Sequence, residues 1–179
     1  RTTTGGAVAR GRMMQTAVQQ TRDQWGVDDE REVLTFDLAG ETFAFDATMV
    51  QEILDLLPET AVPGSRPFVG SVINFRGKVI PLADIRLAFG MESTKATIDS
   101  RIIVVELDIE GEPTLVGVRT DKVYEVTTLS RTSREDPPSI GMRWRADYID
   151  CLVKRGTDFV IIPNLNEIFS AKRDAQTAA

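Results

Sequence analysis

Short hydrophobic runs, many of them alternating with polar residues, dominate the chain from residue 32 onward. Gly, Pro or Asp closes most of these runs, which is typical of a protein built from many short β-strands. Residues 33–38 and 42–45 flank Ala39-Gly40-Glu41 and predict a β-hairpin. The pattern predicts further strands at 50–57, 71–75 and 78–82, with Arg76-Gly77 as a tight turn between the last two. Only short helices are indicated, at 86–91 and 164–172.

Two parts of the chain repeat one another. Residues 33–41 align without a gap with residues 104–112, at an offset of 71. Later matches keep the same order at slightly larger offsets, pairing 50–53 with 123–126, 68–73 with 148–153, and 76–77 with 155–156. We therefore predict two similar β lobes related by pseudo-symmetry, with repeat units at about 33–90 and 103–169. Because units of about 70 residues are marginal alone, the lobes should share a core.

Residues 1–31 precede the β pattern as an N-terminal extension, and residues 171–179 follow it as a C-terminal tail. Met14, Val18 and Trp25 recur in the extension at spacings of four and seven. This spacing indicates a short amphipathic helix over 12–25, which would dock by these three side chains onto an apolar groove. A frayed tail is the alternative, because isolated helices shorter than about 12–15 residues are marginal in water.

The charge balance bears on the class of partner. The chain has 179 residues, with 21 Lys and Arg against 27 Asp and Glu, and a net charge of −6. This acidic balance disfavours nucleic acid or an anionic membrane as the main partner. The hydrophobic runs are the length of strands, so the sequence predicts no transmembrane segment and no membrane insertion.

The sequence contains no His and only one Cys, Cys151. The lack of His excludes His-based acid–base catalysis and phosphohistidine transfer, and a lone Cys forms neither an internal disulfide nor a metal-binding cluster. Paired carboxylates are the remaining route to an enzyme, but no spacing among the acids singles out a pair. We therefore predict a non-enzyme with no catalytic residues, cofactor or metal, in a reducing, intracellular setting.

Several motifs taken together resemble the CheW-like adaptor domain of bacterial chemotaxis. They are the opening hairpin, the strand Val50-Gln51-Glu52-Ile53, the run 68–85 that contains Asn74-Phe75-Arg76-Gly77, and the segments 117–123 and 160–165. The resemblance covers residues 32–170, which defines the predicted domain. It implies a mainly β fold of two five-stranded SH3-like barrels packed around a common apolar core, with a short C-terminal helix. This agrees with the repeat found independently.

The resemblance implies a non-catalytic cytoplasmic adaptor. CheW-like domains couple the cytoplasmic tips of chemoreceptors to the histidine kinase CheA, whose regulatory domain has the same two-barrel fold. The two alternate in rings at membrane-associated receptor arrays, so self-association in rings is a further expectation. One alternative is a regulatory domain detached from a larger protein of the CheA or CheV type. Another is an adaptor of a non-flagellar chemosensory pathway.

The resemblance also selects residues. Glu52 and Arg76 match the family's strand glutamate and turn arginine, and the repeat offers Glu125 and Arg155 as their equivalents. We expect a structural ion pair that pins the turn at Arg76-Gly77 to the strand, with direct contact to receptor or kinase as the alternative. Val50 is the candidate for an apolar receptor contact, and core packing is the alternative for it.

Overall fold

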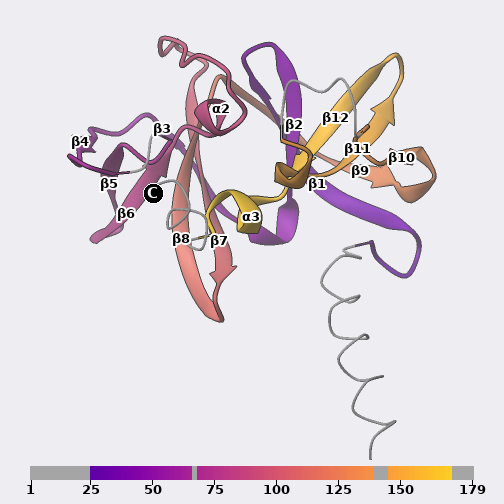
Figure 1. Ribbon diagram of the computed structural model, residues 1–179, viewed down its shortest axis with the longest axis horizontal. Coiled ribbons are helices and arrows are strands. Elements are labelled where there is room, and N and C mark those ends of the chain that lie inside the picture. The colour runs from indigo at the N-terminus through magenta and orange to yellow at the C-terminus, as the bar shows by residue number, and fades with distance from the viewer. Residues whose placement is uncertain (1–24, 66–67, 139–144, 171–179) are drawn as a thin grey trace, which may run out of the picture.

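The computed structural model describes residues 25–65, 68–138 and 145–170, which form two β lobes side by side (Figure 1). Lobe A contains, in spatial order, β10 (Arg134–Glu135), β11 (Ile149–Arg155), β12 (Asp158–Pro163), β2 (Glu41–Asp46), β1 (Glu30–Leu38) and β9 (Lys122–Ser130). Lobe B contains β3 (Val50–Asp55), β7 (Arg101–Ile109), β8 (Glu112–Thr120), β6 (Lys78–Ala83), β5 (Ser71–Phe75) and β4 (Thr60–Ala61). Each sheet thus has five strands of at least five residues and one edge strand of two, which confirms the mainly β, two-lobed fold.

The lobes do not coincide with the sequence repeats. The first repeat supplies the hairpin β1–β2 to lobe A but β3 to β6 to lobe B, and the second repeat does the reverse with β7–β8 and β9 to β12. Parallel pairing of β12 with β2, and of β6 with β8, joins strands of different repeats within each sheet. The expectation that one repeat forms one lobe is therefore wrong, because each sheet is completed by a hairpin from the other repeat.

The helices are shorter than predicted. The structure has α2 (Ile85–Ala88) and α3 (Leu165–Ile168), with the 3-10 turns η1 (Ala47–Met49), η2 (Arg131–Ser133) and η3 (Ala146–Tyr148). Asp84 and Asn164 cap the two α-helices by accepting hydrogen bonds from backbone N–H groups of the first turn. The predicted strand at 50–57 ends at Asp55. Residues 12–24 of the predicted N-terminal helix and residues 171–172 of the C-terminal one lie outside the described residues.

A shared core between the lobes explains why β7 reads as a continuous hydrophobic run. Ile103 and Val105 belong to the shared core, whereas Ile102 and Val104 face the interior of lobe B. A strand whose two faces are both buried has no polar alternation to show. Aromatic rings from both lobes pack together in the shared core. The ring centroids of Phe43 and Phe89 are 5.4 Å apart. Within the described residues, no helix is both long enough and apolar enough to span a bilayer.

Candidate functional site

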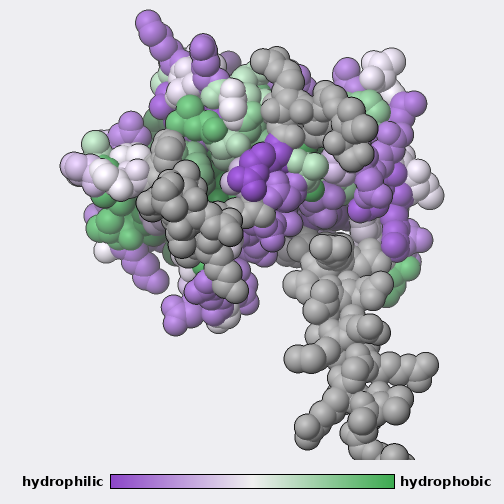
Figure 2. Space-filling view, viewed as in Figure 1, coloured by the Kyte–Doolittle hydropathy of each residue, from purple (hydrophilic) through white to green (hydrophobic). Residues whose placement is uncertain are grey.

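The edge strand β3 places an apolar strip at the side of lobe B. Among the strands of the described residues, β7 is its only neighbour in the sheet. Val50 is half-buried and packs against the shared core, while Ile53 is 44% exposed. Val79 on the neighbouring hairpin is 72% exposed. Figure 2 shows hydrophobic side chains gathered over β5 and β6, whereas the lobe A side of this view is mainly hydrophilic. Val50 thus packs against the core, as the core-packing alternative for this residue expected, and part of it is still accessible to a partner.

Arg76 and Glu52 meet at the end of this strip. Arg76 Nη2 lies 2.9 Å from Glu52 Oε2, which is a buried oxygen that accepts no hydrogen bond of good geometry. The contact is therefore ionic. Most of the Arg76 side chain is exposed, and its guanidinium lies 5.4 Å from the centre of the Phe75 ring. An ion pair this exposed contributes about 0–1 kcal/mol to stability, so it leaves the arginine available to a partner.

The turn that carries Arg76 has an unusual backbone. Arg76 and Gly77 have φ angles of 50° and 80°, as a two-residue turn of type I′ requires. Gly77 tolerates this conformation freely, whereas a side chain such as that of Arg76 is uncommon there. Gly77 N–H also donates to Asn74 Oδ1 at 2.9 Å, which closes the turn. Ala39-Gly40 and Glu110-Gly111 adopt the same pair of positive φ angles, so the hairpins β1–β2 and β7–β8 share this conformation. At Arg76 it holds the arginine in a fixed place at the tip of the β5–β6 hairpin.

The second repeat does not reproduce this pair. The ladder of β11 and β12 matches that of β5 and β6 at an offset of 80, so Arg155, opposite Asp158, is the equivalent of Phe75 rather than Arg76. Glu125 lies in an irregular stretch of β9, where its backbone oxygen accepts a hydrogen bond from Thr35. Within the described residues, neither Glu125 nor Arg155 forms an ion pair. The sequence alignment assigned Arg155 one position out of register, because it matched the two Arg-Gly pairs although the β-ladder places Gly156 at the position equivalent to Arg76. Glu125 lies at a β-bulge in the pairing of β1 with β9, which the alignment could not detect.

Two buried arginines form ionic clusters that the sequence analysis missed. In lobe A, Arg31 donates through Nε and Nη2 to both oxygens of Asp46, the second at 2.8 Å, and through Nη1 to Asp150 at 2.9 Å. Burial alone would lower the pKa of Arg31, but the hydrogen bonds and charges of the two carboxylates outweigh it and raise that pKa. The alternation of residues along β1 could have predicted the burial of Arg31, since Arg31 and Val33 lie two positions apart and are both buried on the same face of the strand.

In lobe B, Arg86 of α2 is fully buried. It donates to Asp84 Oδ1 and Oδ2 at 2.7 and 2.9 Å and to Asp121 Oδ1 at 2.6 Å. Asp121 is the single residue between β8 of lobe B and β9 of lobe A, and it also accepts from Ala39 N–H at 2.7 Å. The Arg86 cluster therefore ties α2 to the crossing between the lobes.

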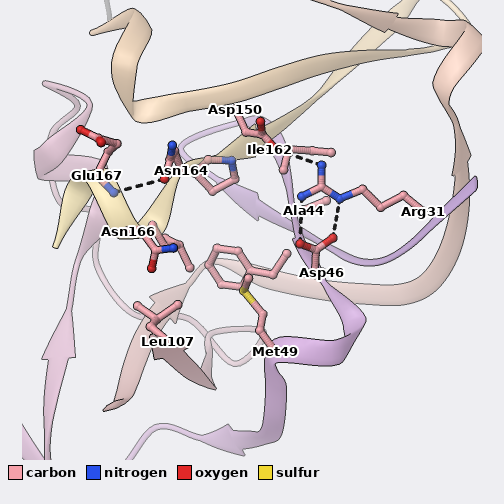
Figure 3. Close-up of a pocket in the computed structure, with 13 residues that line it drawn as sticks. Arg31, Ala44, Asp46, Met49, Leu107, Asp150, Ile162, Asn164, Asn166 and Glu167 are labelled. Carbon is pink, nitrogen blue, oxygen red and sulfur yellow. Dashed lines mark hydrogen bonds and ion pairs between the residues drawn. The ribbon is translucent and has the colours of Figure 1, made fainter. Parts of the chain in front are cut away.

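A cavity of about 290 Å³ opens beside Arg31, between the end of β2, the start of β11 and α3 (Figure 3). Its polar lining comes from the Arg31 cluster and from Asn164, Asn166 and Glu167. Met49 and Leu107 are among its apolar lining residues. Buried charge combined with apolar walls suits the binding of a small polar group or a partner's side chain.

Trp25 is the remaining candidate from the sequence, and Cys151 is the only cysteine of the chain. Trp25 is half-buried against the interior cluster of lobe A, with its ring 5.8 Å from the Arg31 guanidinium. Met14 and Val18 lie outside the described residues. Cys151 is buried, and burial together with the charge of Asp150 raises the pKa of its thiol to about 11, so it is not a nucleophile at neutral pH. Among the described residues, no group of His, Cys, Asp and Glu is placed to hold a metal ion.

Two six-stranded β lobes that exchange hairpins around a shared core, with an edge strand and an exposed arginine on one of them, define a two-lobed β scaffold. The family model of the CheW-like domain matches residues 32–173, and the chain belongs to this family. Curated relatives include the chemotaxis protein CheW of Bacillus subtilis, 30% identical over 82% of this chain and 90% of the relative. The CheW protein of Treponema pallidum is 23% identical over 81% of this chain and 85% of its own length.

A solved structure has the same fold. The crystal structure of the scaffolding protein TtCheW from Thermoanaerobacter tengcongensis matches with a TM-score of 0.68 and 31% sequence identity. The match covers 78% of this chain and 92% of that protein. The predicted resemblance to the CheW-like family is therefore confirmed, together with the assignment to chemotaxis scaffold proteins.

Proposed function

We propose that this protein is a non-catalytic cytoplasmic adaptor that couples chemoreceptors to the histidine kinase CheA. The carrying observation is the edge of lobe B, where Val50 is partly accessible and Ile53 is exposed beside the largely exposed side chain of Arg76. Family membership and the scaffold title of the solved relative support the same role. The proposal requires no cofactor or metal.

The apolar strip along β3 is the proposed receptor contact. A receptor tip is a helical hairpin, and an amphipathic helix binds by laying its apolar face on such a strip. Val50 and Ile53 would supply apolar contact, and the exposed guanidinium of Arg76 would pair with an acidic side chain of the helix. The Glu52 carboxylate would then act as a positioning group, because it holds Arg76 from the opposite side at 2.9 Å.

Binding measurements with purified components test this proposal. The full chain should bind both a receptor-tip fragment and the CheA regulatory domain, and Val50→Thr should weaken receptor binding about tenfold, since it replaces a methyl group by a hydroxyl group at the contact. Val27→Thr makes the same change at a fully exposed position and serves as its control. Receptor binding that is unaffected by Val50→Thr would exclude this strip as the contact.

Charge reversal tests the role of Arg76 separately. Arg76→Glu should weaken partner binding about tenfold or more while the free energy of unfolding changes by about 1 kcal/mol or less. Arg155→Glu is the matched control, because this residue also lies at the end of a hairpin strand but makes no ion pair in the described structure. If Arg76→Glu unfolds the protein or leaves both affinities unchanged, Arg76 has only the structural role.

A further inference from the structure

The interiors of the two lobes are built from equivalent positions of the two repeats. The hairpins β1–β2 and β7–β8 match at an offset of 71, and the hairpins β5–β6 and β11–β12 match at an offset of 80. Most apolar side chains inside lobe A therefore have apolar equivalents inside lobe B. In lobe A these are Val33, Leu129, Val153, Val160 and Ile162, and in lobe B they are Val104, Leu54, Ile73, Ile80 and Leu82.

Three other interior positions differ between the lobes. Lobe B fills them with large apolar side chains, those of Ile102, Leu115 and Phe75. The equivalent residues of lobe A are Arg31, Ala44 and Arg155. Arg31 is buried but charged, Ala44 is small, and Arg155 is exposed. The sheet of lobe A therefore supplies less apolar volume to its own interior than the sheet of lobe B does.

Trp25 supplies apolar surface to this smaller interior from outside the sheet. Its side chain is half-buried and packs against the interior cluster of lobe A. The ring also lies 5.8 Å from the guanidinium of Arg31, within the range of a cation–π contact. An indole ring covers a large apolar area, so it can offset the side-chain volume that Ala44 and Arg155 do not provide.

A closed turn places Trp25 on lobe A. Asp29 N–H donates to the backbone oxygen of Gly26 at 3.0 Å, and Gly26 N–H donates to that of Glu30 at 2.9 Å. Arg131 N–H donates to the backbone oxygen of Asp29 at 2.8 Å, which fixes the turn to the end of β9. A Cβ atom on Gly26 would lie 3.3 Å from Glu30 O, so glycine suits this close approach. Backbone hydrogen bonds thus hold the indole ring against the lobe.

We propose that lobe A contains a binding site for an aromatic side chain, and that Trp25 of the same chain fills it. The site is formed by the interior cluster of lobe A together with Arg31. It is separate from the β3 strip and does not depend on the proposed receptor contact. The folded domain therefore begins at Trp25, before the family match starts at residue 32, and the N-terminal extension is tethered to lobe A.

Removing the ring and returning it as a small molecule tests the site. In the full chain, Trp25→Ala should lower Tm by about 5 °C or more, because it empties a half-buried aromatic site. Indole at about 5 mM should then raise the Tm of this variant by about 2–4 °C. The unmodified chain should not respond, because its site is filled. An indole shift that is equal for the two proteins, or absent from the variant, would overturn the proposal.

Two further variants supply controls. Val27→Ala removes an apolar side chain from the same turn at a fully exposed position, and it should change neither Tm nor the response to indole. Trp25→Phe keeps an aromatic ring in the site, so it should lose less than about half of the Tm that Trp25→Ala loses. Equal Tm values for Trp25→Phe and Trp25→Ala would show that the site does not require an aromatic ring.

The dependence of Tm on protein concentration tests which chain supplies the ring. Within one chain the contact is independent of concentration, so the Tm of the unmodified protein should stay constant over a hundredfold dilution, to within about 1 °C. A Tm that rises with concentration, and that no longer does so in Trp25→Ala, would show that Trp25 fills the site of a second copy. That result would contradict the assignment to the same chain.

Discussion

At the scale of single residues, two buried arginines distinguish this domain. Removing a charge from water is expensive, and a buried guanidinium is tolerated only when carboxylates replace its hydration. Arg31 has Asp46 and Asp150, and Arg86 has Asp84 and Asp121. Losing one partner leaves the other charge buried and uncompensated, so these clusters should respond strongly to substitution.

Arg31→Met should lower the free energy of unfolding by about 3–5 kcal/mol, because it leaves Asp46 buried without a counter-ion. Urea unfolding at neutral pH measures the loss. Arg76→Met removes an arginine that is largely exposed and should cost about 0–1 kcal/mol. Similar losses for the two variants would show that the Arg31 cluster contributes no more than a surface ion pair.

The Asp84 cluster predicts a dependence of stability on pH. Burial alone would raise the pKa of Asp84, but hydrogen bonds from Arg86 and Ser93 and the charge of Arg86 outweigh it and hold that pKa below its usual 3.8. A carboxyl whose pKa is lower in the folded state adds stability above its unfolded pKa, and this is lost as the pH falls through the folded value.

Asp84→Asn should therefore be less stable than the unmodified chain by a constant margin between about pH 7 and pH 5, and this margin should narrow below about pH 4. Urea unfolding of both proteins across this range gives the margin. A margin that stays constant down to about pH 2 would contradict the lowered pKa.

At the scale of elements, Gly117 allows β8 to pack closely inside lobe B. A Cβ atom there would lie 3.2 Å from side-chain carbons of both Ile102 and Ile73. Both of these isoleucines belong to the interior cluster of lobe B. Glycine therefore serves close packing in this strand rather than a turn.

Gly117→Ala should lower the free energy of unfolding by about 1–3 kcal/mol through overpacking. In a chain of this size, each kcal/mol lowers Tm by about 2–4 °C, which calorimetry can detect. Gly70→Ala is the control, because a Cβ atom there meets nothing within 4 Å. Equal Tm values for Gly117→Ala and the unmodified chain would mean that the two isoleucines move aside freely.

At the scale of the whole molecule, the exchanged hairpins make the lobes interdependent. Neither repeat holds all the strands of either sheet, and the shared core draws on both. The protein should therefore unfold as one unit, although its chain is a tandem repeat.

Separating the repeats tests this interdependence. If the chain is cut between Ala96 and Thr97, in the loop between α2 and β7, each half alone should lack the dispersed NMR signals of a folded protein. Mixing the halves should restore the dispersion, because each supplies the hairpin that completes the other's sheet. A half that folds alone as a monomer would show that its own hairpin can close a barrel.

Local pattern determined much of this protein by itself. Alternation and turn residues located the hairpins, and the repeat indicated two lobes with a common core, because strand periodicity and turn conformation depend on neighbours in sequence. The sequence motif around Arg76 indicated the CheW-like family, and with it the ion pair between Arg76 and Glu52. These features need no knowledge of which strands pair across the molecule.

Only the tertiary structure decided which hairpin completes which sheet, because either repeat's hairpin offers similar edges and hydrophobic faces to both. It also decided the true register of the second repeat, where a β-bulge displaces Glu125 and the regular β11–β12 ladder places Arg155 one position before the equivalent of Arg76. The burial of Arg31 and Arg86 is likewise a feature that only the tertiary structure decided. Their carboxylate partners come from several elements, and burial of charge depends on what surrounds a residue in space.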